Sequence, residues 1–139
     1  MRCFPILLVL LLASCSKEPS TFIPAPRSIA TAEQVRADAS KWASQDANRY
    51  WSAILPTGSM KPFVDEHSIA LCVRYTGQSL SNGAVVIYRR DTATPRVIHV
   101  VSDQNAESVY MSGYANRQSD GWYPKSSIEG IMVGQFYLP

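Results

Sequence analysis

Features that mark metal centres, nucleotide sites and nucleic-acid binders are scarce in this sequence. It has three cysteines and two histidines among 139 residues, and they do not show the spacing of a zinc site. It has no glycine-rich phosphate loop and no internal repeat. Thirteen basic residues nearly balance eleven acidic ones, without a basic cluster beyond the pair Arg89-Arg90. We therefore expect no metal ion, no cofactor and no nucleic-acid partner.

A hydrophobic run long enough to cross a membrane is also missing. The longest run, Phe4 to Ala13, follows a single positive charge at Arg2, whereas a membrane-spanning helix needs about 20 apolar residues. A charged start, a short apolar middle and an end of small residues describe a secretory signal. We therefore expect residues 1–14 to be a signal peptide that is removed.

The end of this signal, Leu12-Ala13-Ser14-Cys15, resembles the lipobox of bacterial lipoproteins. In that motif the cysteine receives diacylglycerol before cleavage in front of it. The resemblance implies that Cys15 becomes the first residue of the mature chain and carries diacylglyceryl and palmitate groups, which hold a protein on a membrane almost permanently. We expect a protein of the cell envelope, anchored on the periplasmic or extracytoplasmic side, and Ser16 permits the outer membrane. The alternative is an ordinary secretory signal with an incidental cysteine.

Cys72 is the cysteine that remains once Cys3 is removed with the signal and Cys15 carries lipid. It lies in the apolar run Ile69 to Val73, where a free cysteine usually behaves as a small buried hydrophobe. We therefore expect a structural Cys72 and no disulfide.

The mature chain is long enough for one domain with a hydrophobic core. Residues 15–30 are rich in proline and serine and are expected to form a tether. Residues 31–55 contain no glycine or proline, and Thr31 with Gln34 fits a capping box. They predict one amphipathic helix over about 32–53, whose aromatic residues pack on the domain that follows.

Residues 56–139 have a different pattern, in which short runs of Val, Ile and Tyr alternate with turn-forming residues. Such punctuation predicts a mostly β domain with antiparallel strands. The expected strands are 68–75, 84–89, 97–102, 108–111 and 130–138, with a long loop at 112–127.

The segment Pro56-Thr57-Gly58-Ser59-Met60-Lys61-Pro62 resembles the nucleophile box of the type I signal peptidases and the related self-cleaving SOS repressors. That family has the pattern Ser/Thr-Gly-Ser-Met-x-Pro, and its second serine corresponds to Ser59. Conjugation-type signal peptidases carry the variant that begins Pro-Thr-Gly-Ser-Met. The resemblance implies a serine peptidase with Ser59 as its nucleophile.

The order of the family's later motifs is also present. Gly83 to Arg89 stands where the family has a glycine followed by Val-Val-x-Tyr/Phe, with Ala84 at a usually acidic position. The segment Pro95 to Val101 stands where the family has the strand with its general base, and Ile128 to Gly134 resembles the closing strand. The resemblance covers about 56–137. It implies a small, signal-peptidase-like antiparallel β domain, preceded here by the helix.

The resemblance favours His99 as the general base. The lysine-type base is excluded because Pro95 stands at its position and no lysine lies on 95–102. His99 follows Ser59 at an interval similar to that of the His-using branch of the family. An imidazole can take the proton of a serine near neutral pH. His67, which comes directly after the box, is the competing base, and a buried structural histidine is the ordinary alternative for His99.

The family's carboxylate comes from the late loop, where it orients the histidine. Tyr114 occupies the first such position and cannot do this. Asp120 falls near the second such position and is the first candidate for this role, and Asp103 is the second candidate. Asp120-Gly121 is also a typical turn pair, which is the plainer reading of that aspartate.

The oxyanion donors implied by the family pattern are the backbone N–H of Ser59 and the hydroxyl of Thr57. One such donor is commonly worth about 2.7–4 kcal/mol in the transition state. Gly58 between them allows the tight turn that lets both groups face one oxygen.

Together these features predict a membrane-tethered serine endopeptidase of the signal-peptidase type. Its substrate would be an extended peptide or preprotein with small side chains near the cut. Two alternatives stay open: a catalytically inactive envelope lipoprotein that acts as a peptide-binding or structural module, and a protein that cleaves itself. The missing lysine, Tyr114, Ala84 and the lipid anchor are departures from the family that argue against general signal-peptide processing.

Overall fold

The computed structural model describes residues 30–139. The predicted signal peptide, the lipid attachment at Cys15 and nearly all of the predicted tether lie outside the described residues. Within residues 30–139 there is no helix with the length and the apolar character needed to cross a bilayer. This part of the chain forms one α-helix and one seven-stranded antiparallel sheet, which confirms the predicted mostly β class.

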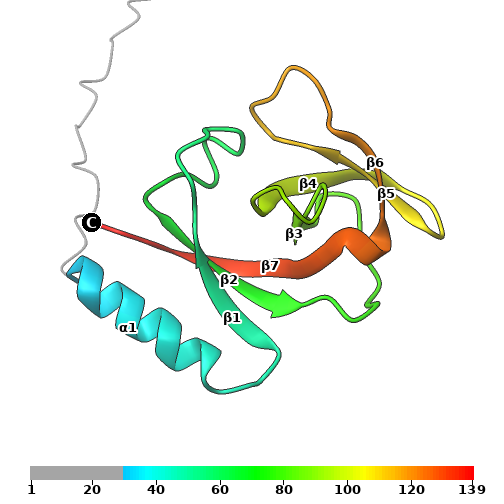
Figure 1. Cartoon of the computed structure of the whole chain (residues 1–139). Coiled ribbons are helices and arrows are strands. Elements are labelled where there is room, and N and C mark those ends of the chain that lie inside the picture. The colour runs from blue at the N-terminus through cyan, green and yellow to red at the C-terminus, as the bar shows by residue number, and fades with distance from the viewer. Residues whose placement is uncertain (1–29) are drawn as a thin grey trace, which may run out of the picture.

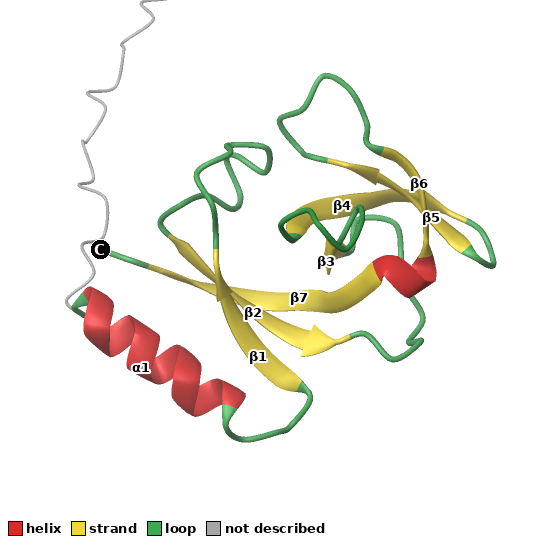
Figure 2. Ribbon diagram, viewed as in Figure 1, coloured by secondary structure: helices red, strands yellow, loops and turns green. Residues whose placement is uncertain are grey.

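The helix α1 lies beside β1 at one end of the sheet, as Figures 1 and 2 show. Across the sheet the strand order is β1-β2-β7-β3-β4-β5-β6. The strands are β1 Arg49–Ala53, β2 Ser68–Arg74, β3 Val85–Tyr88, β4 Val97–Gln104, β5 Ser108–Ser112, β6 Gly121–Pro124 and β7 Ile128–Tyr137, and the short 3₁₀ helix η1, Lys125–Ser127, precedes β7.

The helix α1, Ala32–Ala43, begins at the predicted capping box. The Thr31 hydroxyl accepts the N–H of Gln34 at 3.2 Å, and the Gln34 side-chain oxygen accepts the N–H of Thr31 at 2.7 Å. These two bonds satisfy backbone donors that an uncapped first turn would leave free. The buried face of α1 then packs on the first strands of the sheet; its members are Val35 and Ala39, against Ile69 and Leu71.

The predicted helix is wrong beyond residue 43, because the chain turns there and forms β1. The Asp46 carboxylate accepts the N–H of Asn48 at 2.8 Å and so stabilises the turn. Residues 49–53 then pair with β2, and the aromatic pair Tyr50-Trp51 belongs to a strand rather than to the helix. Short Asp and Asn side chains favour turns, and aromatic side chains favour strands.

The five predicted strands are present, with ends that differ by one or two residues, and two further strands were not predicted. One is β1, and the other is β6, which falls within the predicted loop at 112–127. Its four residues, Gly-Trp-Tyr-Pro, are too few to show an alternating pattern. β6 exists because it pairs with β5, and a long-range pairing of this kind leaves no local signal.

β7 joins the two halves of the sheet. It pairs with β2 along one side, and its first residues pair with β3 on the other side. Close packing occurs at Gly130 of β7, where the Tyr50 hydroxyl lies 2.0 Å from the position that a Cβ would take. Cys72, opposite Met132 of β7, is fully buried and free, as predicted. Burial raises the pKa of its thiol to about 12.

Candidate functional site

The segment that carries Ser59 follows β1 and folds into a series of tight turns. Gly58 has a φ of +71°, in the left-handed region that side chains rarely adopt, so this turn favours glycine. The Met60 side chain is 3% exposed and anchors the segment in the domain. Ser59 itself is half-buried, and its Oγ lies 3.3 Å from Thr57 Oγ1. The two predicted oxyanion residues are therefore neighbours.

The loop between β5 and β6 also contacts the Ser59 segment. The Ser59 carbonyl accepts the N–H of Ala115 at 2.8 Å. A Cβ on Gly113 would stand 2.8 Å from the same carbonyl oxygen, so the close approach of these two backbones requires glycine at that position. The late loop thus fixes the position of the candidate nucleophile.

His99 lies within β4, opposite Val86 of β3. Opposite residues of an antiparallel pair point to the same face of a sheet, and so do residues two apart on one strand. His99 therefore shares a face with Val86 and Tyr88, and its ring centroid lies 6.3 Å from that of Tyr88. Its side chain is 3% exposed. The pairing of β3 with β4 thus sets the place of the imidazole.

Asp120 ends the loop after β5, and its carboxylate contacts the imidazole. Its Oδ2 contacts Nδ1 of His99 and accepts the Tyr88 hydroxyl at 2.7 Å, while its Oδ1 accepts the Arg90 guanidinium at 2.7 Å. Burial opposes ionisation of this carboxyl. The hydrogen bonds from Tyr88 and His99, helped by the charge of Arg90, outweigh it, so the pKa of Asp120 lies below its usual value. An ionised carboxylate therefore sits against Nδ1.

Ser59 and His99 both line one open cleft of about 750 Å³. One wall of the cleft is the end of β1 with the Ser59 segment, and the other is the hairpin of β3 and β4. Thr57 lines the cleft as well. Within residues 30–139 no hydrogen bond joins Ser59 Oγ to His99, and Nε2 of His99 has no hydrogen-bond partner. Catalytic hydrogen bonds of this kind are often long before a substrate binds.

The competing site residues lie elsewhere. His67 is exposed, does not line the cleft, and donates its backbone N–H to the Asp65 carboxylate at 2.9 Å. Asp103 is exposed, and its carboxylate accepts the N–H of the next residue. Tyr114 packs edge-on against Phe63, with 4.4 Å between the two ring centroids. Of the predicted base and carboxylate candidates, His99 and Asp120 are the two that meet.

Two residues around Asp120 were not among the predicted site residues. Tyr88 falls within the predicted strand 84–89, and its alternation with Val86 places it on the same face of the sheet as His99. Arg90 was noted as half of a basic pair. Its partner Asp120 is 30 residues away in the sequence, so no local pattern could have linked them. No group of three or more His, Cys, Asp or Glu side chains within residues 30–139 is placed to hold a metal ion.

Neither a protein-family model, nor a curated protein, nor a solved structure matches this chain. A serine hydroxyl lining the same cleft as an imidazole that is held by an ionised carboxylate is one of the sets of groups used for nucleophilic acyl transfer.

Proposed function

We propose that this protein is a serine endopeptidase of the signal-peptidase type, tethered to a membrane of the cell envelope through a lipid on Cys15. Ser59 is the nucleophile, His99 is the general base, and Asp120 orients the base. The observation that carries the proposal is the contact of Asp120 with Nδ1 of a histidine whose ring lines the same cleft as Ser59. The Ser59 segment, with its resemblance to a peptidase nucleophile box, supports it independently.

The reaction begins with attack by Ser59. Because Nδ1 of His99 faces Asp120, Nε2 is the nitrogen left to take the hydroxyl proton. Oγ bonds to the carbonyl carbon of the scissile peptide as the proton moves to Nε2. The C–N bond then breaks, the leaving amine takes that proton, and an acyl-enzyme remains. Water adds to the ester with the same proton transfers and releases the carboxylic acid and Ser59.

The negative oxygen of the tetrahedral intermediate needs hydrogen-bond donors. Within residues 30–139 the backbone N–H of Ser59 donates to no backbone carbonyl, so it is free to bind this oxygen. The second donor is the Thr57 hydroxyl, which lies beside Ser59 Oγ. Each donor of this kind is worth about 2.7–4 kcal/mol when it is aimed at the developing charge.

The substrate that suits this cleft is an extended peptide or preprotein. Among the described residues β1 pairs with β2 alone and so lies at the edge of the sheet, and Ser52 and Ala53 at its end line the cleft. A peptide could therefore add to the sheet beside β1 and carry its scissile bond to Ser59. The resemblance adds a preference for small side chains near the cut.

A second candidate function is a peptide-binding module without catalysis. The observation that favours it is the hydrogen bond of Ser59 Oγ, which is made with Thr57 rather than with His99. In this alternative the cleft and the end of β1 that lines it bind a peptide, and the Ser–His chemistry is not used.

The test that separates the two is covalent labelling of the full chain with a fluorophosphonate, which reacts with activated serines. We expect labelling at Ser59, located by mass spectrometry, and its loss in both Ser59→Ala and His99→Ala. Ser52→Ala and His67→Ala are the matched controls, because Ser52 lines the cleft without an imidazole partner and His67 lies outside it. Labelling that is absent from Ser59, or unchanged in His99→Ala, would leave the peptide-binding module as the function.

A further inference from the structure

The ionised side chains of the cleft carry charge of one sign. Three arginines line it, and of the residues 30–139 no aspartate or glutamate does. All three come from the hairpin of β3 and β4, on the wall that faces the Ser59 segment; they are Arg89, Arg90 and Arg96. The whole sequence has nearly balanced charge, so this bias belongs to the cleft.

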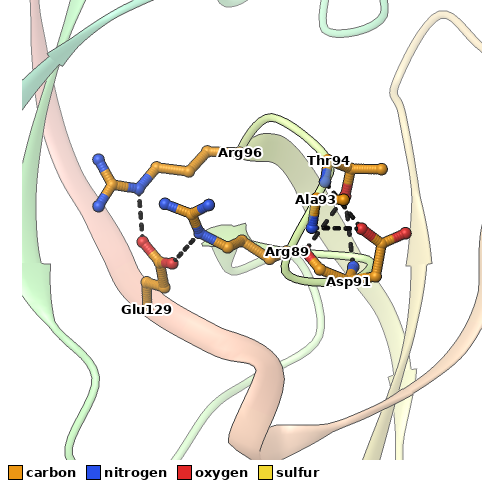
Figure 3. A network of polar contacts seen from close by, with 6 residues as sticks. All are labelled: Arg89, Asp91, Ala93, Thr94, Arg96 and Glu129. Carbon is orange, nitrogen blue, oxygen red and sulfur yellow. Dashed lines mark hydrogen bonds and ion pairs between the residues drawn. The ribbon is translucent and has the colours of Figure 1, made fainter.

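Glu129 of β7 holds two of these arginines side by side. Arg89 donates its Nε to Oε1 at 2.5 Å, and Arg96 donates its Nε to Oε2 at 2.5 Å, as Figure 3 shows. Burial opposes ionisation of Glu129, but the bonds from Arg89 and Arg96 outweigh it and hold the pKa of this carboxyl below its usual value. One carboxylate therefore serves two guanidinium groups.

This arrangement leaves donors free at the cleft. Each of the two guanidinium groups uses its Nε alone, so within residues 30–139 the terminal nitrogens of Arg89 and Arg96 have no hydrogen-bond partner. Their side chains are 39% and 53% exposed. Two positive charges against one negative charge leave an excess of one. The free N–H groups along the edge of a planar guanidinium match the two oxygens of a carboxylate better than an ammonium group does.

The neighbouring charges do not cancel this excess. Arg90 is paired with Asp120, so that pair is neutral. Asp91, on the same hairpin, uses its Oδ1 to accept the N–H groups of Ala93 and Thr94 at 2.8 and 2.7 Å. In Figure 3 the Asp91 carboxylate points away from the Arg89 guanidinium. Its charge stabilises the hairpin turn and does not neutralise the cleft.

We infer that the cleft selects peptides that carry an aspartate or glutamate side chain, bound by the terminal nitrogens of Arg89 and Arg96. The inference rests on the proposed function in one respect, namely that a peptide occupies the cleft. Ser59 and the arginine pair line the same cleft, so the acidic residue lies within a few positions of the scissile bond. Glu129 acts as a positioning residue that presents both guanidinium groups before the peptide arrives.

Binding to the full chain carrying Ser59→Ala tests this selection without cleavage. The probes are fluorescent polyalanine peptides with blocked ends, each with one glutamate at a different position, and the same peptides with glutamine there. Blocked ends remove the terminal carboxylate, so the two sets differ in the side chain alone. At the position that meets the arginine pair we expect glutamate to bind about tenfold more tightly than glutamine. This advantage should shrink as salt is added, since one partner of the contact is partly exposed.

Variants of Arg96, the more exposed of the two arginines, assign the contact. Arg96→Gln should remove most of the preference for glutamate. Arg96→Lys should keep part of it, because lysine retains the positive charge but lacks the planar set of N–H donors that binds both carboxylate oxygens. Arg36→Gln, an exposed residue of α1 outside the cleft, makes the same charge change and should leave the preference intact.

The outcomes separate this inference from the proposed function. Equal binding of the glutamate and glutamine peptides, or no binding of either peptide at concentrations up to about 1 mM, overturns the inference. If the fluorophosphonate still labels Ser59, the peptidase stands without acidic selection. A preference for glutamate that depends on Arg96, without labelling of Ser59, supports the inference and leaves the protein as a module that binds acidic peptides.

Discussion

The Tyr88 hydroxyl and the His99 imidazole meet at a single oxygen, Oδ2 of Asp120. The other oxygen of that carboxylate is held by Arg90. A carboxylate tied at both oxygens cannot rotate freely, so the plane of the imidazole and the tautomer with a proton on Nδ1 are set by residues of two neighbouring strands and one loop. This is the relationship on which the proposed chemistry depends.

Asp120→Asn should lower peptidase activity by about 10²–10⁴-fold, because an amide nitrogen at this place favours the wrong tautomer of His99. Tyr88→Phe should lower it less, since Arg90 and His99 still hold the carboxylate. The rate of fluorophosphonate labelling at Ser59 measures both effects. Equal rates for the wild-type protein and Asp120→Asn would remove Asp120 from the mechanism.

Acid should destabilise the protein through Asp120. Its pKa in the folded state lies below the usual value, so its contribution is present above about pH 3.9, the ordinary pKa of an aspartate, and is lost as the pH falls through the folded-state pKa. Asp120→Asn should lower the free energy of unfolding at pH 7 by about 1–3 kcal/mol and flatten its dependence on pH below 4. Urea unfolding at pH 7 and pH 3 measures this, with the exposed Asp103→Asn as the control.

Cys72 should be unreactive in the folded protein. Burial raises the pKa of its thiol to about 12, so the thiolate that attacks a disulfide reagent is scarce at pH 8. We expect reaction of Cys72 with a disulfide reagent only after denaturant is added, with Cys72→Ala giving the background of the other cysteines. At a pH below the pKa that the Cys72 thiol has in the unfolded chain, the thiol is neutral in both states and its burial does not oppose folding. Stability is lost as the pH rises from about 8.5 through about 12.

Gly113→Ala should impair the site more than the fold. The added Cβ would stand 2.8 Å from the Ser59 carbonyl oxygen and 2.5 Å from the Asn116 side chain, and backbone cannot yield as a side chain can. We expect the Ser59 segment to move and labelling to fall at least about tenfold, while thermal unfolding shifts by a few degrees, about 1 kcal/mol. A loss of all cooperative unfolding would show that Gly113 serves the fold instead.

Cys15→Ala should release the protein from membranes and remove the lipid from its N-terminus, because two or more acyl chains provide nearly permanent attachment. Fractionation and the intact mass of the mature protein measure this. A wild-type protein that keeps residues 1–14 and carries no lipid would contradict the anchoring proposal.

The sequence was enough to predict the elements whose signal is local. The capping box of Thr31 and Gln34 marks the start of α1, and the Val-rich runs mark β3 and β4. The end of α1 and the strand β1 were missed, because 31–55 contains no glycine or proline to mark the break. That break depends on Asp46 and on the pairing of β1 with β2, which is a tertiary effect.

The candidate site shows the same division. Ser59, Thr57 and His99 were predicted from motif order, and the structure brings them to one cleft. Asp120 was a candidate on position alone, and its contact with His99 became visible only with the sheet assembled. Arg90 and Glu129 had no local signal, since their partners are 30 to 40 residues away in the sequence.

The place of β7 in the sheet also sets when the site can exist. Within the sheet, β1 and β2, which flank Ser59 in the sequence, are joined to β4, which carries His99, through β7, the last of the seven strands in sequence. A chain that emerges from the ribosome or a translocation channel with its N-terminus first therefore lacks the continuous sheet between its serine and its histidine until β7 arrives. The proposed peptidase would be inert during export and would acquire its activity with its last strand.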